Sequence, residues 1–227
     1  STLGRENILK IYTKDPEFRF FMSIQILLIV TCTLVMISHQ YFDSSWQDFE
    51  QVVFQAVSIS TTTGYTTSNF AEWPSFVPML LIIASFIGGC AGSVGGGLRV
   101  ARILVLYLQG ARELKRFVHP NLVYPIKWGQ NVLDERVIGS IWAFFSAYLL
   151  VFTICLLSVI ACGVEPFDAF NAVLASINNL GPGLGSVSSN MTAMPDSAKW
   201  VLTIAMVCGR LEIFTLLALF TPAFWKA

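Results

Sequence analysis

The chain has 227 residues, of which 55% are hydrophobic and 12% are charged, and its formal net charge at pH 7 is zero. A soluble domain carries about 25% charged residues, so most of this chain must face lipid or packed protein. The balanced charge argues against a nucleic-acid-binding module. The five cysteines, odd in number and set in apolar stretches, exclude a secreted disulfide scaffold.

Four stretches are long and apolar enough to predict membrane-spanning helices, which need roughly 20 mostly apolar residues. In chain order they cover about residues 18–37, 74–108, 137–162 and 199–224. The second is interrupted by six glycines between Gly88 and Gly97, and the fourth carries Arg210 and Glu212 near its middle. We therefore expect a multi-pass membrane protein whose second span is broken.

The lysines and arginines predict the orientation of these spans. Seven of them lie between Arg99 and Arg136, and others lie in the N-terminal segment and at the C-terminus, whereas the loops 38–75 and 163–199 hold only Lys199. Positive residues mark the cytoplasmic side, so both termini and the central loop are expected there. The two outer loops carry seven acids, whose negative potential concentrates cations.

The two halves of the chain repeat the same order of parts. A span is followed by an outer loop, a short amphipathic segment, a turn rich in glycine, a polar stretch and a second span. The short segments are residues 48–60 and 167–178. Placing Gly64 on Gly181 gives a spacing of 117 residues, which also places Gly92 on Gly209.

The short segments predict re-entrant pore loops. A helix of 12 residues is about 18 Å long, well short of the roughly 30 Å hydrocarbon core, so the chain must turn back inside the membrane. Non-helical backbone at that depth must be buried in protein or line a water-filled cavity. Carbonyl groups at such a turn, beside the negative end of the helix dipole, favour a cation. The alternative is an ordinary outer loop with an interfacial helix.

Two features of the predicted spans are unusual, the glycine-rich break and Arg210. The break lacks the Lys-Ser/Thr of a nucleotide-binding loop, and six glycines exceed what a kink needs. An arginine inside a span costs roughly 2.5 to 3.5 kcal/mol. An ion pair with Glu212 is disfavoured because residues two apart lie on different helix faces. The repeat register places Arg210 beside Gly92–Ser93, where we expect it to oppose cations below the filter.

Together these motifs resemble a known family. They are STTTGYTTS at Ser60–Ser68, NNLGPGLG at Asn178–Gly185, the break from Gly88 to Arg102, and Gly-Arg-Leu-Glu at Gly209–Glu212. They are similar to the Trk/Ktr/HKT superfamily of potassium transporters and, within it, to the bacterial TrkH transmembrane subunits. There one polypeptide carries four units around one pore. The chain therefore resembles the C-terminal half, with pore-loop units three and four, and the two N-terminal units would be a partner.

The resemblance implies an all-α membrane protein with two parallel helix–pore loop–helix repeats around a pseudo-fourfold pore axis. It implies a filter with potassium at Thr62, Thr63, Asn179 and Leu180. The full set of filter residues is Thr62, Thr63, Gly64, Tyr65, Asn179, Leu180, Gly181 and Pro182. The family's intramembrane gate maps onto Gly88, Gly89, Gly92, Ser93, Gly95, Gly96, Gly97 and Arg210.

The expected organisation is a cytoplasmic segment at 1–17, a first repeat at 18–108, a basic linker at 109–136 and a second repeat at 137–227. The expected function is potassium uptake through a gated, channel-like pore in the bacterial inner membrane, without enzymatic chemistry. Potassium is the substrate, and no cofactor is expected in this chain. The resemblance also implies a homodimer on a cytoplasmic regulatory ring that binds NAD and ATP or ADP. An alternating-access carrier, a non-conducting structural half and an intramembrane enzyme are the rivals.

Overall fold

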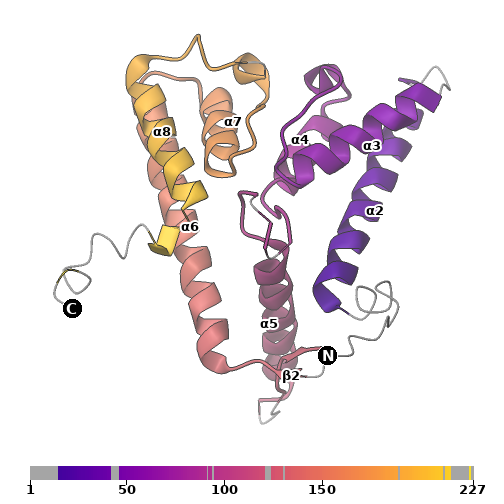
Figure 1. Ribbon diagram of the computed structural model, residues 1–227, viewed down its shortest axis with the longest axis vertical. Coiled ribbons are helices and arrows are strands. Elements are labelled where there is room, and N and C mark those ends of the chain that lie inside the picture. Colours follow the sequence, from indigo (N-terminus) through magenta and orange to yellow (C-terminus); the bar gives the residue numbers. More distant parts are fainter. Residues whose placement is uncertain are drawn as a thin grey trace, which may run out of the picture.

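The structure is a computed structural model that describes residues 15–41, 46–90, 92–93, 95–120, 124–129, 131–188, 190–211, 213–215 and 225. These residues are mostly helical (Figure 1). The first half contains α2 (Pro16–Ser38), α3 (Trp46–Ser60), the 3-10 turn η1 (Phe70–Glu72), α4 (Phe76–Ala84) and α5 (Val100–Val118). The second half contains α6 (Glu135–Ala161), α7 (Pro166–Ile177), η2 (Gly185–Val187) and α8 (Asp196–Arg210). Between the halves, β1 (Lys127–Trp128) pairs antiparallel with β2 (Asn131–Val132).

Helices α2 and α6 begin in the same way and are apolar along their length. The side chains of Asp15 and Asp134 accept hydrogen bonds from the N–H groups of Glu17 (3.1 Å) and Arg136 (3.2 Å), which caps the two helices. Among the described residues, these are the two helices long and apolar enough to cross a membrane. Only 22% of each apolar window is buried within the chain, so the exposed leucines are placed to face lipid.

The second and fourth predicted spans are each interrupted. Helix α4 stops at Ala84, and the chain becomes helical again only at Val100, which agrees with the glycine-rich break. Helix α5 then runs to Val118, nine residues past the expected start of the linker at 109. Helix α8 ends at Arg210, the chain bends at Leu211, and residues 213–215 are helical again. Residues 216–224 lie outside the described part of the chain.

The short helices α3 and α7 enter the molecule from one end and stop near its middle. In Figure 1 both run downward toward the centre, and the chain then climbs back to the end where it started. Their 15 and 12 residues correspond to about 22 Å and 18 Å at 1.5 Å per residue. Neither helix can cross a hydrocarbon core of roughly 30 Å.

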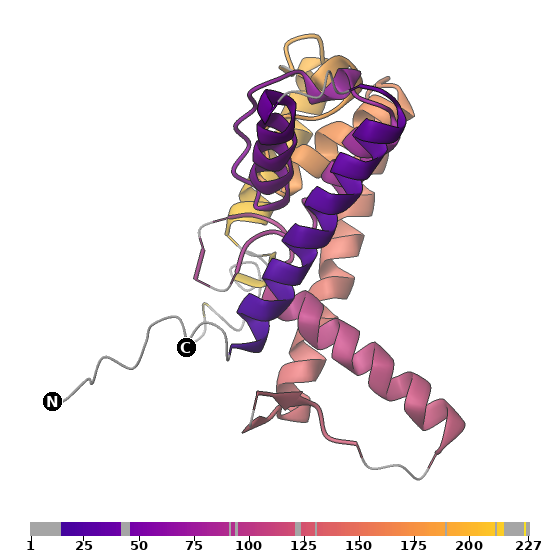
Figure 2. The same ribbon diagram turned by 90° about the vertical axis from the view of Figure 1, so that its right-hand side faces the viewer.

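The two halves have the same direction and share one core. Helices α2 and α6 both rise from the lower end of the molecule, and α4 and α8 both descend (Figures 1 and 2). Helix α2 packs on α3 and α4, and α6 packs on α7 and α8. Between the halves, α4 contacts α7 and α5 contacts α6. The parallel repeat expected from the sequence is therefore present, and one hydrophobic cluster joins both halves.

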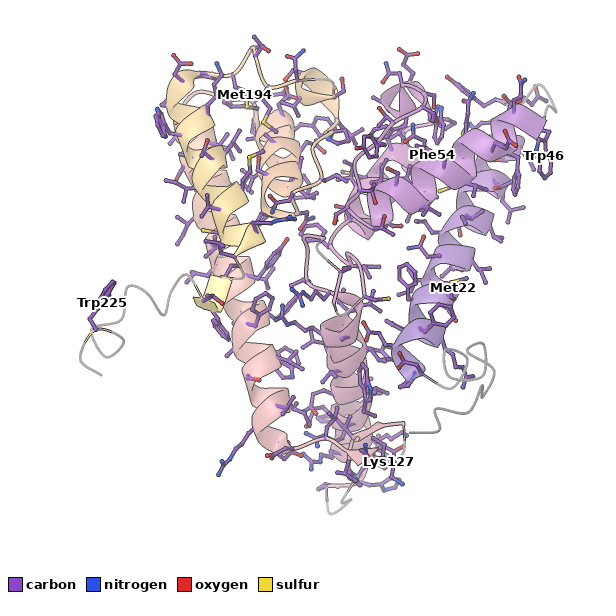
Figure 3. The ribbon with its side chains drawn as sticks, in the orientation of Figure 1. Met22, Trp46, Phe54, Lys127, Met194 and Trp225 are labelled. Carbon is purple, nitrogen blue, oxygen red and sulfur yellow. The ribbon has the colours of Figure 1, made fainter. Side chains whose placement is uncertain are left out.

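The basic end lies opposite the end at which α3 and α7 enter. Figure 3 shows Lys127 at the lower end, and Trp46 and Met194 at the upper end. Near the lower end, Arg112 of α5 is 3% exposed and binds both carboxylate oxygens of Glu135 on α6, with Nη2 to Oε2 at 3.1 Å. This two-pronged ion pair fixes α5 against α6.

Candidate functional site

Helices α3 and α7 end in the same backbone turn. The N–H of Thr62 donates to the carbonyl of Ile59 (3.1 Å), and the N–H of Thr63 donates to Ser58 (2.8 Å). At a spacing of 117 residues, Asn179 donates to Ser176 (3.0 Å) and Leu180 donates to Ala175 (2.9 Å). This pair of bonds is the Schellman motif, which closes the C-terminus of a helix. The predicted repeat spacing therefore holds for individual hydrogen bonds.

Positive φ angles recur at the same spacing. Thr62 has φ +57° and Asn179 has φ +51°, while Gly64 has φ +82° and Gly181 has φ +97°. Asparagine tolerates this region, but for a β-branched residue such as threonine it is an outlier. Strained backbone of this kind concentrates at functional sites. The two turns thus share a conformation that neither side chain at the first position favours by itself.

The two turns lie against each other. A Cβ atom on Gly64 would overlap the carbonyl oxygen of Leu180 and come within 3.5 Å of Cδ of Pro182. Gly181 has no described atom within 4 Å of its own Cβ position. Gly64 is therefore required by both packing and φ, and Gly181 by φ. Segments more than a hundred residues apart in sequence meet at one place.

An open hollow lies above the meeting point. It measures about 590 Å³ and is lined by both turns and the chain that follows them, through Gly64, Thr66, Asn69, Pro182 and Ser188 among others. Thr63 is exposed, and Tyr65 is 72% exposed. Leu180 is only 2% exposed, so this residue can face an ion only through its main-chain oxygen.

The first N–H groups of each turn point back into its helix, whereas the carbonyl groups of Thr62, Thr63 and Leu180 do not. Besides the bonds above, Gly64 donates to Ser58 at 3.3 Å. Among the described residues, no hydrogen bond reaches the carbonyl oxygens of Thr62, Thr63 or Leu180. Backbone carbonyl groups are obligatory acceptors that seek a partner. A cation is such a partner, and the negative end of each helix dipole favours it.

The returning chain of each repeat is bound to its own short helix. In the first, Ser58 Oγ donates to the carbonyl of Tyr65 (2.7 Å), and Gln55 Nε2 donates to that of Ser68 (2.9 Å). In the second, the N–H of Ser186 donates to Asp168 Oδ1 (3.2 Å), and its hydroxyl donates to the same carboxylate. These bonds hold each turn against its helix.

The glycine-rich segment lies directly below both turns. The N–H of Gly96 donates to Thr62 Oγ1 (3.0 Å). A Cβ on Gly96 would overlap the carbonyl oxygen of Asn178, and one on Gly95 would lie 2.8 Å from Thr62 Oγ1. The segment is also bonded to itself, from Leu98 to Phe86 at 2.9 Å. The contacts at Gly95 and Gly96 depend on the absence of side chains.

The glycines expected to form the gate fall into two groups. Gly88, Gly89, Gly95, Gly96 and Gly97 each have neighbours that a Cβ would strike or crowd. Gly92 has no atom of the described residues within 4 Å of its Cβ position, and Gly92 and Ser93 are both exposed. Of the first group, Gly95 and Gly96 contact the residues at the turns, and the others pack within the segment or against the end of α4.

The predicted equivalence of Gly92 and Gly209 is wrong. A Cβ on Gly209 of α8 would overlap the carbonyl oxygen of Ile177 and lie 2.8 Å from Asn179 Nδ2. The first-half glycine with a related contact is Gly95, because a Cβ there would lie 2.8 Å from Oγ1 of Thr62, the residue equivalent to Asn179. The offset there is 114 residues because the first half is looped where α8 remains helical.

Arg210 lies beside the glycine-rich segment, at the level of Gly95 rather than Gly92. It lines a small cavity of about 20 Å³ together with Gly95, Gly97, Arg99 and Phe144. The guanidinium carbon of Arg102 sits 3.9 Å from the ring centre of Phe144. Glu212, the partner weighed for Arg210, lies outside the described residues.

Sequence reasoning missed three buried polar residues at this site. Asn178, the last residue before the second turn, is fully buried, and Tyr148 OH donates to its Oδ1 (2.7 Å). Its Nδ2 donates to Oγ of Ser85, which is also fully buried (3.0 Å). The available signal was a pair of adjacent asparagines at the end of an apolar segment, but the partners are 30 and 93 residues away.

Known proteins resemble the whole chain. A family model described as TrkH, a cation transport protein, matches residues 10–227. The Trk system potassium uptake protein TrkH of Vibrio parahaemolyticus is 57% identical over 96% of this chain and 45% of the relative. TrkH of Escherichia coli K12 is 56% identical over the same shares, and TrkG of that organism is 34% identical.

A solved structure has the same fold. The crystal structure of the potassium transporter TrkH from Vibrio parahaemolyticus superposes with a TM-score of 0.90 at 57% identity. The match covers 95% of this chain and 46% of that one. The chain therefore spans about half the length of the relatives it matches.

Proposed function

Because this chain belongs to the TrkH family of cation transport proteins, we propose that it forms about half of the ion pathway of a potassium uptake transporter. The printed names of its relatives describe potassium uptake. The chain covers less than half of each relative, and four pore-loop units around one pore are expected for the whole transporter. The two turns described above would then be two of four filter segments.

The observation that carries the proposal is the contact between two equivalent turns. Gly64 packs on the main chain of Leu180, and the two Schellman motifs aim carbonyl groups away from their helices. A potassium ion that leaves water must replace its hydration shell, and a ring of carbonyl oxygens can supply that replacement. The first turn contributes Thr62, Thr63, Gly64 and Tyr65. The second contributes Asn179, Leu180, Gly181 and Pro182.

The glycine-rich segment is proposed as the gate of the same pathway. It lies below the turns and is hydrogen-bonded to Thr62 through Gly96. In that position it occupies the route that an ion would take from the filter toward the basic end. Arg210 lines a cavity with this segment, and its positive charge opposes the passage of cations below the filter.

The proposed orientation places the basic end in the cytoplasm. The short helices enter from the opposite end (Figures 1 and 3), which agrees with the positive-inside distribution of charge. The proposed location is the bacterial inner membrane, with both termini inside. As in the family, the transporter would be a homodimer whose cytoplasmic ring binds NAD and ATP or ADP.

The parallel direction of the halves favours a channel-like pathway over an alternating-access carrier. Many secondary carriers use inverted repeats with binding near the midplane, whereas here both halves run the same way. A non-conducting structural half is the second alternative. It predicts that the turns tolerate substitutions without loss of transport.

Rubidium uptake into potassium-starved cells tests the proposal. The cells express the transporter that contains this chain, as wild type, Gly64→Ala or Gly139→Ala. Gly64→Ala should abolish uptake because its Cβ would overlap the oxygen of Leu180. Gly139 on α6 has open space at its Cβ position, so that variant should transport normally. Equal uptake by all three, at equal membrane content, would refute the filter assignment.

A further inference from the structure

The amide of Asn178 joins the second turn to the glycine-rich segment through a closed set of buried hydrogen bonds. Its Oδ1 accepts from Tyr148 on α6, and its Nδ2 donates to Ser85, which caps α4 three residues before the glycine-rich segment. The carbonyl oxygen of Ser85 lies 3.0 Å from the Cβ position of Gly97 in that segment. Both Asn178 and Ser85 are fully buried. Tyr148 is 3% exposed.

Asn178 also touches the glycine-rich segment itself. Its carbonyl oxygen is the atom that a Cβ on Gly96 would overlap. The side chain of this residue therefore contacts the cap of α4, while its main chain contacts the segment. The next residue, Asn179, has the left-handed conformation that begins the filter turn. A shift of the segment must disturb Asn178, and Asn178 adjoins the turn directly.

The orientation of the amide is fixed by its two partners. Tyr148 OH is a donor to Oδ1, so the nitrogen faces Ser85, whose hydroxyl donates onward to the carbonyl of Ile82 (2.6 Å). Ser85 Oγ thus accepts from Asn178 and donates to α4. Each member of the chain has its bond, and a buried network of this kind specifies one arrangement.

We propose that Asn178 is a positioning residue that couples the conformation of the second filter turn to the closed position of the glycine-rich gate. The inference rests on the proposed function and adds regulation to it. When the gate moves, the Nδ2 group loses Ser85 and is left buried without an acceptor, which is costly. The turn must then adjust to satisfy it.

Such coupling acts in both directions. If gate position alters the second turn, then an ion bound at that turn alters the gate by the same factor, because linkage between two binding equilibria is reciprocal. Potassium should therefore change the exposure of the gate even when no net flux occurs. Ser85→Ala should remove that effect, although Ser85 lies in neither turn.

Cys90 reports the position of the gate. It lies in the glycine-rich segment and is partly exposed, as is Cys162 at the end of α6, whereas Cys32, Cys155 and Cys208 are buried. The rate at which a maleimide modifies Cys90 is measured by mass spectrometry on the purified full transporter, in potassium and in choline. We expect a several-fold difference in rate for the wild type and a ratio near one for Ser85→Ala.

Ser140→Ala is the matched control. Ser140 Oγ donates to the carbonyl three residues earlier, Val137, as Ser85 does to Ile82, but it is exposed and distant in sequence from the gate. This variant should keep the wild-type potassium effect. Tyr148→Phe removes the hydrogen bond that fixes the orientation of the Asn178 amide. This variant should weaken the potassium effect on Cys90 while leaving the hydroxyl of Ser85 in place.

The flux of the same preparations separates the two proposals. If the wild type conducts rubidium and Ser85→Ala keeps the full potassium effect on Cys90, the coupling through Asn178 is refuted and the filter stands. A potassium effect that is absent from a conducting wild type refutes the coupling equally. A wild type that carries no rubidium at all overturns the proposed function itself. Loss of the effect in Ser85→Ala alone supports the coupling.

Discussion

At the scale of single residues, the filter turns depend on backbone conformation more than on side-chain chemistry. Thr62 and Asn179 differ in type, yet both have positive φ and both occupy the same position in the Schellman motif that closes the helix. Two glycines complete the turns at positions where φ is again positive. The sequence spacing located these glycines because glycine is the default residue for such conformations.

Substitutions at Gly181 should follow the tolerance of each residue for positive φ. Its φ is +97° and its Cβ position is open among the described residues. Gly181→Asn should therefore retain more rubidium uptake than Gly181→Val, since a β-branched residue is the stronger outlier and such strain costs about 1–3 kcal/mol. The same two substitutions at Gly139 serve as controls, because this residue lies in helix α6 and has no described atom within 4 Å of its Cβ position. Equal uptake by both Gly181 variants would contradict the prediction.

The hydroxyl of Thr62 should keep the gate closed. Thr62→Val preserves the shape of the side chain but leaves the N–H of buried Gly96 without its acceptor, which costs about 1–3 kcal/mol. We expect a higher rubidium leak into resting vesicles. Thr62→Ser retains the acceptor and should stay closed. A leak that is the same in both variants would show that the hydroxyl of Thr62 does not hold the gate closed.

Asn178 shows why part of the site could not be predicted from sequence. Its neighbours in the chain mark a turn, and the turn was found. Its bonds to Ser85 and Tyr148 depend on how α4 and α6 pack around α7, and no local pattern records that packing. The pairing of Gly92 with Gly209 fails for the same reason. The second half is helical at Gly209, whereas the first half is looped there, so the two halves use different numbers of residues to reach the same place.

At the scale of elements, the repeat was predictable and the helix ends were not. The lengths of α2, α3, α6 and α7 follow from apolar runs and from capping residues such as Asp15 and Asp134. Apolar composition continues past Ala84 while the helix stops, and α8 ends at Arg210 with a bend at Leu211 before residues 213–215 become helical again. In the first case the glycines explain the stop, because they lose more conformational entropy in a helix than other residues.

The charge of Arg210, at the end of α8, should limit leak through the closed gate. Arg210→Ala removes the positive group beside Gly95 and Gly97, so cations should pass more easily in the resting state. Arg210→Lys keeps the charge and should restore low leak. Resting rubidium flux in vesicles measures this, with Arg136→Ala, an exposed arginine at the start of α6, as control. A leak in Arg210→Ala equal to that of wild type would remove this arginine from the gate.

The ion pair between α5 and α6 should stabilise the basic end. Arg112 is 3% exposed, so Glu135→Ala would leave a buried guanidinium without its two-pronged partner. We expect a loss of stability, seen as a lower thermal unfolding temperature. Arg112→Met together with Glu135→Gln should recover part of that loss, because no buried charge remains. A double variant less stable than Glu135→Ala would contradict this explanation.

At the scale of the whole molecule, the two halves form one body that is open on one side. The halves are joined by α4 on α7, by α5 on α6, and by Gly64 on Leu180. Tyr65 is 72% exposed and Gly181 has open space around it. The chain spans about 45% of relatives such as TrkH of Escherichia coli, which agrees with the proposal that two further units complete the pore.

The remaining units should be needed for transport. Potassium-starved cells that express this chain alone should take up no more rubidium than empty cells, because two turns surround an ion on part of its circumference only. Cells that also express the other half of a close relative should take up rubidium. Full uptake with the chain alone would instead indicate that two copies of this chain form the pore.

The direction of the hydrogen bonds in the two turns also bears on chloride and phosphate. In each turn the N–H groups that close the Schellman motif are already donated to helix carbonyls, so they do not solvate a negative ion. An anion arriving in the hollow would meet oxygen atoms and the negative poles of two helix dipoles. Rejection of anions therefore follows from the way these helices end, and needs no acidic side chain in the turns themselves.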